Sequence, residues 1–243
     1  MSRINDEIHA EDVSVQANGF YSIAIDGPSG VGKTSIARRI AEKCGFVYID
    51  TGAMFRALGV HFLNKGIRID DEAQIQKELP GIRLEVKYLD KIQHMIVNGI
   101  DVTGELRTEE VSRAASVISQ YRHVRARLLE MQRELAATAN VVMDGRDIGT
   151  VVLPHATLKA FLTALPKVRA ERRYKQLVEL DKLEGATLES IEKDIEERDY
   201  RDSHREIAPL KPADDAVLID TSYITIDEVE EKILEALKEK TGA

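Results

Sequence analysis

The sequence predicts an α/β fold of three layers, α/β/α, with helices on both faces of a five-stranded parallel sheet. Short apolar segments rich in β-branched residues alternate with longer segments of helical periodicity, and the first apolar segment leads into a glycine-rich turn. Uninterrupted apolar runs are typical of strands buried on both faces of a parallel sheet. The strands are expected at 22–25, 46–49, 141–143, 158–162 and 217–219.

Helices are expected between these strands, because strands that alternate with helices form parallel sheets covered on both faces. The helical segments are 33–44, 52–64, 108–138, 166–180, 188–205 and 226–240.

Residues 82–103 break this alternation. Apolar and charged side chains alternate there, and Asp90-Lys91 and Asn98-Gly99 are turn signals. We therefore expect a small antiparallel sheet, inserted between the second and third core strands with boundaries near 65 and 107. A second insert, at about 166–205, is helical and rich in charge.

Composition narrows the class of protein. The 243 residues carry a formal net charge of −8, so the surface as a whole is not suited to nucleic acid. No segment approaches the ~18 apolar residues of a membrane span, and the polar extension at 1–19 lacks the apolar core of a secretory signal. The one cysteine, Cys44, excludes an intrachain disulfide. A cytoplasmic protein is expected.

A glycine-rich loop, Gly-Pro-Ser-Gly-Val-Gly-Lys-Thr at 27–34, follows the first strand and opens the first helix. Strand, loop and helix together predict a phosphate-binding loop, whose backbone N–H groups and helix N-terminus surround an anion. Lys33 is expected to contact the β- and γ-phosphates of a nucleoside triphosphate, and the Thr34 hydroxyl to bind Mg²⁺. The triphosphate-binding residues are expected to be Gly27, Pro28, Ser29, Gly30, Val31, Gly32, Lys33, Thr34 and Ser35.

A phosphate loop does not define a reaction, and three polar clusters narrow the choice. The first follows the second strand. Asp50 and Thr51 can cap the next helix there, and Arg56 lies in the second turn of that helix. Its guanidinium could hold a second phosphate-bearing substrate.

The second cluster, Asp144-Gly145-Arg146-Asp147, follows the third core strand. Asp144 resembles the acidic residue that supports Mg²⁺ through water in phosphate-loop enzymes. Gly145 allows a tight turn that would present Arg146 and Asp147 above the sheet. A charged turn with a local ion pair is the alternative, but surface ion pairs stabilise by only ~0–1 kcal/mol.

The third cluster consists of charged residues in the helical insert. The i, i+3, i+4 and i+7 spacing of one helix face is shared by Arg198, Arg201, Asp202 and Arg205. The preceding helix contains Arg169, Arg172 and Arg173. Such charges often form only a solvated face, but phosphoryl transfer consists largely of aligning two anions and neutralising charge, which favours a phosphoryl clamp.

With these clusters the sequence resembles the bacterial cytidylate kinases, the (d)CMP kinases among the nucleoside monophosphate kinases. The matching segments are IDGPSGVGKT, DTGAMFRAL, TGELRTEEVSRAAS, YRHVR, MDGRDIGTVVLP and ERDYRDSHREIAPL. The resemblance implies direct in-line transfer of the γ-phosphoryl group of Mg·ATP to CMP or dCMP. It also implies a monophosphate-binding insert and a closing lid.

The resemblance implies domain boundaries and site residues. The core would comprise 20–64, 108–165 and 206–243, the monophosphate-binding insert 65–107, and the lid with its following helix 166–205. The residues serving the transferred phosphoryl group would be Lys33, Arg146, Arg172, Arg173 and Arg201. The CMP-binding residues would be Thr51, Arg56, Ser116, Arg125, Arg146, Asp147, Arg198, Asp202 and Arg205.

Within the CMP set, the resemblance implies that Ser116, Arg125 and Asp147 read the base. Cytosine offers an amino donor that suits a carboxylate, whereas uracil has an acceptor at the same position. Arg198 and Asp202 would hold the sugar. The only partners expected are ATP and CMP or dCMP, with no nucleic acid, no membrane and a monomeric chain.

Three alternatives remain open. A kinase of the same fold could act on another small acceptor such as UMP, although Arg125 and Asp147 favour cytosine. A GTP-dependent switch would need an [NT]-K-x-D element, and the nearest string, Asn64-Lys65-Gly66-Ile67, lacks the acid. A regulator without catalysis would have a damaged phosphate loop or lid, and the sequence contains neither.

Overall fold

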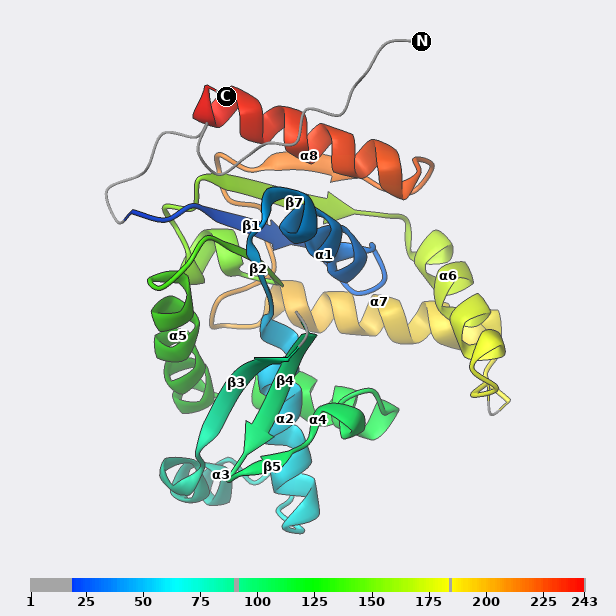
Figure 1. Ribbon diagram of the computed structural model, residues 1–243. Helices are drawn as coiled ribbons and strands as arrows, with labels where there is room; N and C mark the ends of the chain where they lie inside the picture. Colours follow the sequence, from blue (N-terminus) through cyan, green and yellow to red (C-terminus); the bar gives the residue numbers. More distant parts are fainter. Residues whose placement is uncertain (1–18, 90–91, 184, 243) are drawn as a thin grey trace. The chain divides into compact units, whose positions relative to one another are not determined.

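The computed structural model describes residues 19–89, 92–183 and 185–242 (Figure 1). Residues 1–18 of the expected polar extension and the turn signal Asp90-Lys91 lie outside these ranges. The chain divides into two compact units, one formed by residues up to 48 and from 139 onward, the other by residues 49–138. None of the described helices has the length and apolarity needed to cross a bilayer.

A five-stranded sheet is the centre of the first unit, with the strand order β2-β6-β1-β7-β8. Its strands are β1 (Ser22–Asp26), β2 (Val47–Asp50), β6 (Val141–Gly145), β7 (Leu158–Thr163) and β8 (Val217–Asp220). β1 pairs in parallel with both β6 and β7, and β7 with β8. The predicted fold class is confirmed. Strand order reverses at β1, and ligands of such sheets bind at the carboxyl ends next to that point.

Helices α1 (Lys33–Cys44) and α8 (Ile226–Thr241) cover one face of this sheet. Ile23, Val142 and Leu162 are fully buried beneath them, and Ala24 and Met143, which alternate with them along the strands, are fully buried on the other face. Both faces are therefore covered, which explains why the core strands read as continuous apolar runs.

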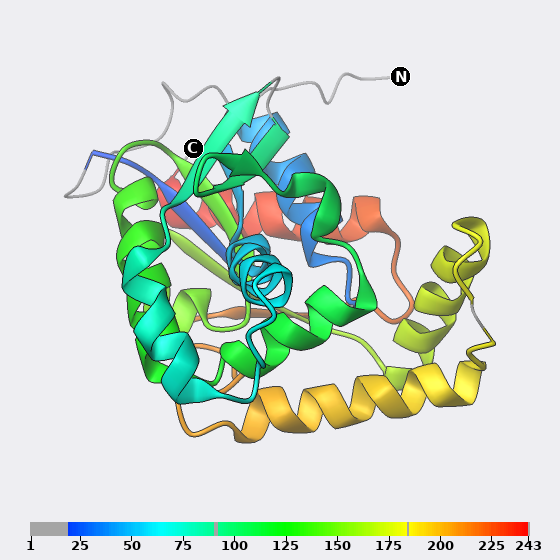
Figure 2. The ribbon, with the colours of Figure 1, turned by 90° about the horizontal axis from the view of Figure 1, so that it is seen from below.

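Two helices follow β7 in the first unit, α6 (Pro166–Glu179) and α7 (Leu188–His204). They pack together through Ala170, Leu177 and Ile191 (Figure 2). A π-helical turn, η3 (Ile148–Val152), follows β6.

The second unit has its own apolar core and a three-stranded antiparallel sheet, β3-β4-β5, as expected from residues 82–103. The turn at Asn98-Gly99 has φ values of 51° and 84°, which suit the two-residue hairpin that joins β4 to β5. Helix α3 and strand β5 were not predicted. The elements are α2 (Thr51–Asn64), α3 (Glu72–Glu78), η1 (Leu79–Gly81), β3 (Leu84–Leu89), β4 (Ile92–Val97), β5 (Ile100–Asp101), η2 (Thr103–Glu105), α4 (Glu109–Ile118) and α5 (Arg122–Ala136).

The single helix expected over 108–138 is wrong, because the chain breaks between α4 and α5. Tyr121 is extended, with φ −79° and ψ 123°, and its hydroxyl donates to the carbonyl of Ile69. The Ser119 hydroxyl donates to the carbonyl of Ser116, and the Ser119 carbonyl accepts from Arg125. The backbone ends α4 with shorter-range bonds, from Gln120 to Val117 and from Tyr121 to Ile118, and the side-chain bonds support this break, with no glycine or proline to signal it.

We expect Ile118→Ala to lower the free energy of unfolding by about 2–5 kcal/mol, because Ile118 is fully buried in the core of the second unit. Ile100→Ala is the matched control, since Ile100 is 66% exposed and should cost less than about 1 kcal/mol. Urea denaturation of both variants measures the difference, and equal losses would contradict the burial of Ile118.

Candidate active site

The phosphate loop crosses the carboxyl end of β1 in close contact with β7. Gly27 has φ 146°, and a Cβ there would lie 2.2 Å from the carbonyl oxygen of Leu162. Gly30 and Gly32 also have positive φ, 82° and 92°, and Gly32 is the residue before α1. Only glycine fits at Gly27, because a side chain would collide with backbone.

Two oxygen-bearing side chains meet beside the loop at the end of β6. The Thr34 hydroxyl donates to one oxygen of Asp144 at 2.9 Å, and the Tyr48 hydroxyl donates to the other at 3.0 Å. Asp144 is 4% exposed, and these bonds hold its carboxylate at the start of α1. The sequence predicted Thr34 and Asp144 as partners of the same cation, and the structure brings them together.

Oxygen donors of this kind match the preference of Mg²⁺. Within the described residues, no group of three or more histidine, cysteine, aspartate or glutamate side chains could hold a metal ion. The two side chains therefore fit a cation whose remaining ligands come from phosphate and water.

Lys33 is buried behind the loop, and its Nζ donates to the carbonyl of Pro28 at 2.6 Å. Burial lowers the pKa of Lys33 well below its usual value, and the positive charge of Arg146 acts in the same direction, while Asp144 opposes both. The charge of Arg198 also lowers it. Cations thus gather around the loop, and an anion would relieve their repulsion.

Two ion pairs connect the Asp144–Asp147 cluster to α7 and the residue after it. Arg146 Nε donates to Asp202 at 2.9 Å, and Arg205 donates to Asp147 at 3.3 Å. Burial would raise the pKa of Asp202, but the charges of Arg146 and Arg198 outweigh it and lower that pKa. Four predicted site residues therefore contact each other in pairs within the first unit.

The remaining arginines of the helical insert have different surroundings. Arg172 donates to the hydroxyl and the carbonyl of Thr221, at 3.2 and 2.5 Å, and the Thr221 hydroxyl donates to the carbonyl of Val31 in the loop. Arg173 donates to Gln176 on the surface of α6, and Arg201 is exposed on α7. Arg172 is thus tied to the loop by a chain of hydrogen bonds.

Arg169 was noted in the sequence but given no role in the site. Its side chain is 3% exposed and donates to the loop carbonyl of Ser29 at 3.2 Å and to Asp199 of α7 at 2.5 Å. It thereby connects α7 to the phosphate loop. Tyr48 and Thr221 were also missed, because a single hydroxyl in a strand or loop has no pattern to mark it.

In the second unit, the predicted residues cluster at the start of α2. Asp50 accepts from the backbone N–H of Ala53 and from Arg56, at 2.8 and 2.7 Å, so it is the helix cap and also an ion-pair partner. Gln93 of β4 bonds both the N–H and the carbonyl of Asp50. Thr51 is buried as the first residue of α2.

Ser116 and Arg125, the predicted base-reading residues of the second unit, lie on α4 and α5. The guanidinium of Arg125 lies 5.8 Å from the ring centre of Phe55, in α2, and donates to the carbonyl of Ser119. The ring contact and the hydrogen bond fix the direction of the Arg125 side chain.

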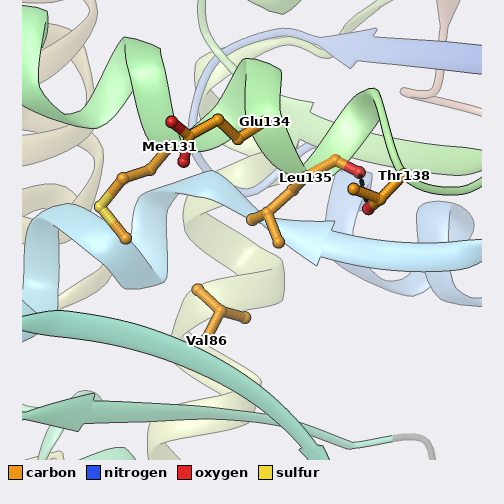
Figure 3. Close-up of a pocket in the computed structure, with 5 residues that line it drawn as sticks. All are labelled: Val86, Met131, Glu134, Leu135 and Thr138. Carbon is orange, nitrogen blue, oxygen red and sulfur yellow. Dashed lines mark hydrogen bonds between the residues drawn. The ribbon is translucent and has the colours of Figure 1, made fainter.

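A pocket elsewhere in the second unit contains none of the predicted site residues. It is lined by Val86, Met131, Glu134, Leu135 and Thr138, between β3 and the end of α5 (Figure 3). Its volume of about 180 Å³ is below the range of typical small-molecule sites, and it offers no cation for a phosphate.

Comparison with known proteins identifies the family. The family model described as cytidylate kinase matches residues 23–239. The chain belongs to the cytidylate kinase family. A curated cytidylate kinase of Lactobacillus johnsonii is 45% identical over 92% of this chain and 96% of its own length. One of Desulforamulus reducens is 47% identical over 87% and 94%.

The activity of the cytidylate kinase family is phosphoryl transfer from ATP to CMP, and its members are nucleoside monophosphate kinases. A solved structure of an uncharacterized protein from Eubacterium ventriosum has a TM-score of 0.50 at 12% identity, covering 90% of this chain and 98% of its own, which is a likeness of fold alone. The resemblance seen in the sequence is confirmed.

We expect Gly27→Ala to weaken ATP binding at least about tenfold, since the strain of such a backbone costs ~1–3 kcal/mol before the clash with Leu162 is counted. Gly104→Ala is the control, because a Cβ there meets no atom within 4 Å. Fluorescent-nucleotide titration and thermal melting of both variants test this, and unchanged nucleotide affinity in Gly27→Ala would contradict the close approach.

Proposed function

We propose that this chain transfers the γ-phosphoryl group of Mg·ATP to the 5′-phosphate of CMP or dCMP, giving CDP or dCDP and ADP. The observation that carries the proposal is the gathering of Arg146 and Arg198 around Lys33 beside a glycine-lined phosphate loop. Their charges suit a reaction that aligns two phosphate-bearing substrates and neutralises charge on the transferred group.

The donor half of the reaction follows from the loop. Its backbone N–H groups would bind the triphosphate, and Lys33 would contact the β- and γ-phosphates. The charge of the bound phosphates would favour protonated Lys33 and reverse the effect of burial on its pKa. Thr34, and Asp144 through water, would hold Mg²⁺, which supplies charge neutralisation on the phosphates.

The acceptor half follows from the motif match and from the contacts within each unit. We assign the phosphate of CMP to Arg56, Arg146 and Arg205, and the sugar to Arg198 and Asp202. Asp202 is kept ionised by its arginine neighbours, so it can accept from ribose hydroxyl groups. Thr51 would contact CMP on its phosphate side, and Arg172, Arg173 and Arg201 would serve the transferred group.

No side chain needs to act as a general base, because a phosphate monoester is already an anionic nucleophile. Base choice would fall to Ser116, Arg125 and Asp147. Arg205 donates to Asp147 and would orient this carboxylate so that it can accept from the amino group of cytosine. Closing of 166–205 as a lid would exclude water from the transferred group.

The division into core, insert at 65–107 and lid at 166–205 stays a prediction. So do a monomeric chain, a cytoplasmic location and the absence of a nucleic-acid partner. Size-exclusion chromatography with light scattering would test whether the chain is monomeric, and a dimer would contradict that prediction.

A coupled ADP-release assay tests the proposed function directly. Mg·ATP is supplied with CMP, dCMP, UMP, AMP, GMP or shikimate as acceptor, and turnover is expected with CMP and dCMP. Release of ADP with UMP at a similar rate would favour a kinase of broader acceptor range. If ATP binds and no acceptor releases ADP, the proposed function is wrong.

We expect Asp147→Asn to reduce the ratio of kcat/KM for CMP over UMP at least about tenfold, because the amide can donate to uracil where the carboxylate cannot. Asp202→Asn is the matched control, since the sugar it would contact is common to both nucleotides and both activities should fall by similar factors. Equal losses for CMP and UMP in Asp147→Asn would remove its base-reading role.

We expect Arg205→Ala to raise KM for CMP about tenfold or more, with a smaller change in KM for ATP, because it removes a charge-assisted bond to the acceptor phosphate. Arg68→Ala serves as control, since Arg68 is 79% exposed and pairs with its neighbour Asp70. Steady-state kinetics with each substrate varied measures both constants. Unchanged use of CMP in Arg205→Ala would contradict the assignment.

A further inference from the structure

Asp26, the last residue of β1, accepts two buried hydrogen bonds from the backbone of η3. Its Oδ1 accepts from the backbone N–H of Ile148 at 2.8 Å and its Oδ2 from that of Gly149 at 2.7 Å. Asp26 is 4% exposed. Both oxygens of one carboxylate are thus used on two consecutive amides more than 120 residues away in the sequence.

These two amides open the turn η3, which begins directly after Arg146 and Asp147. The N–H groups at the start of a helical turn have no partner within it, and no side chain of the preceding residue, Asp147, caps the turn. The carboxylate of Asp26, in strand β1, accepts from these N–H groups and so caps the turn. A residue far away in the sequence therefore satisfies the N–H groups at the start of η3.

Strand β1 also fixes Gly145, the residue that precedes Arg146 and Asp147. In the parallel ladder of β1 and β6, Asp26 stands opposite Gly145. The backbone of Asp26 thus lies beside Gly145, while its side chain binds Ile148 and Gly149. Arg146 and Asp147 are the two residues between these anchors, and Gly27 follows Asp26 directly in the loop.

Burial disfavours the ionised form of Asp26, because the carboxylate loses its hydration. The pKa of Asp26 is raised to about 6, chiefly by burial; the nearby charge of Asp147 adds to the rise, and the two backbone hydrogen bonds and Lys33 oppose it. A buried carboxylate with these neighbours persists where its hydrogen bonds offset desolvation. An amide could accept only one of the two N–H groups, since its other atom is a donor.

We propose that Asp26 is a positioning residue for the acceptor substrate, which fixes Arg146 and Asp147 relative to the phosphate loop. The inference rests on the roles proposed above for these two residues. Asp26 would contact neither nucleotide. It acts through η3, and its loss should damage the use and choice of CMP more than the binding of ATP.

The test compares Asp26→Asn with the wild-type enzyme. We expect kcat/KM for CMP to fall about 10- to 100-fold, as displacements of about 1 Å at a reacting group do, and the preference for CMP over UMP to fall about tenfold. The dissociation constant of ATP should change less than about threefold. Asp101→Asn is the matched control, because Asp101 also ends a strand and accepts a backbone N–H, from Thr103, and it should leave all three values unchanged.

Two kinetic outcomes would overturn the inference: unchanged CMP kinetics in Asp26→Asn, or ATP binding weakened as much as CMP use, which would assign Asp26 to the phosphate loop instead. Absence of CMP turnover in the wild-type enzyme would instead refute the proposed function. The two failures are therefore distinguishable.

Amide hydrogen exchange of the wild-type chain gives a readout that does not depend on the folding of a variant. The amides of Ile148 and Gly149 should be protected without any nucleotide, and exchange at the rate of an exposed loop would overturn the inference. In a folded Asp26→Asn, exchange should quicken at 148–149 and stay unchanged in β1 and β7. A uniform increase across the unit would indicate general destabilisation and contradict the positioning role.

Discussion

The carboxylate of Asp144 is the contact on which the arrangement of the first unit depends. It accepts from Thr34 at the start of α1 and from Tyr48 in β2, while its own strand β6 pairs with β1. One buried acceptor thus holds the first helix and two strands at the edge where the phosphate loop lies. Buried hydrogen bonds to a charged group are each worth more than neutral ones, and leaving either hydroxyl unpaired would cost about 1–3 kcal/mol.

The positive charges of Lys33, Arg146 and Arg198 near this carboxylate do not by themselves stabilise the fold, because like charges repel. The charges of Arg146 and Arg198 lower the pKa of Lys33, so both arginines repel the positive charge of Lys33. Asp202, which pairs with Arg146 and whose pKa is also lowered by Arg198, offsets part of this repulsion. A bound phosphate would relieve the remaining repulsion, so these cations favour an anionic ligand at the loop.

In the second unit, the apolar core and the start of α2 together position Arg56. Its apolar core fixes α2, and the start of α2 is held by Asp50 as a cap and by Gln93 through the backbone. Two sets of hydrogen bonds thus fix the N-terminus of α2, the cap by Asp50 and the backbone contacts of Gln93. The direction of the Arg56 side chain follows from that fixed helix end and from its ion pair with Asp50. Gly52 leaves room for its guanidinium, since a Cβ there would lie 2.9 Å from Nη1.

The sequence by itself determined the sheet, most helices and the phosphate loop, because strand runs, helical periodicity and glycine spacing are local patterns that short segments express independently. It also located Thr34, Asp144 and the arginines, which stand in motifs. Only the tertiary structure decided that α4 and α5 separate, that Tyr48 holds Asp144, that Arg169 joins α7 to the loop, and that Asp26 caps a turn more than 120 residues away. These are single contacts between distant segments, and no local pattern encodes them, because burial and partner choice arise only when the chain is packed.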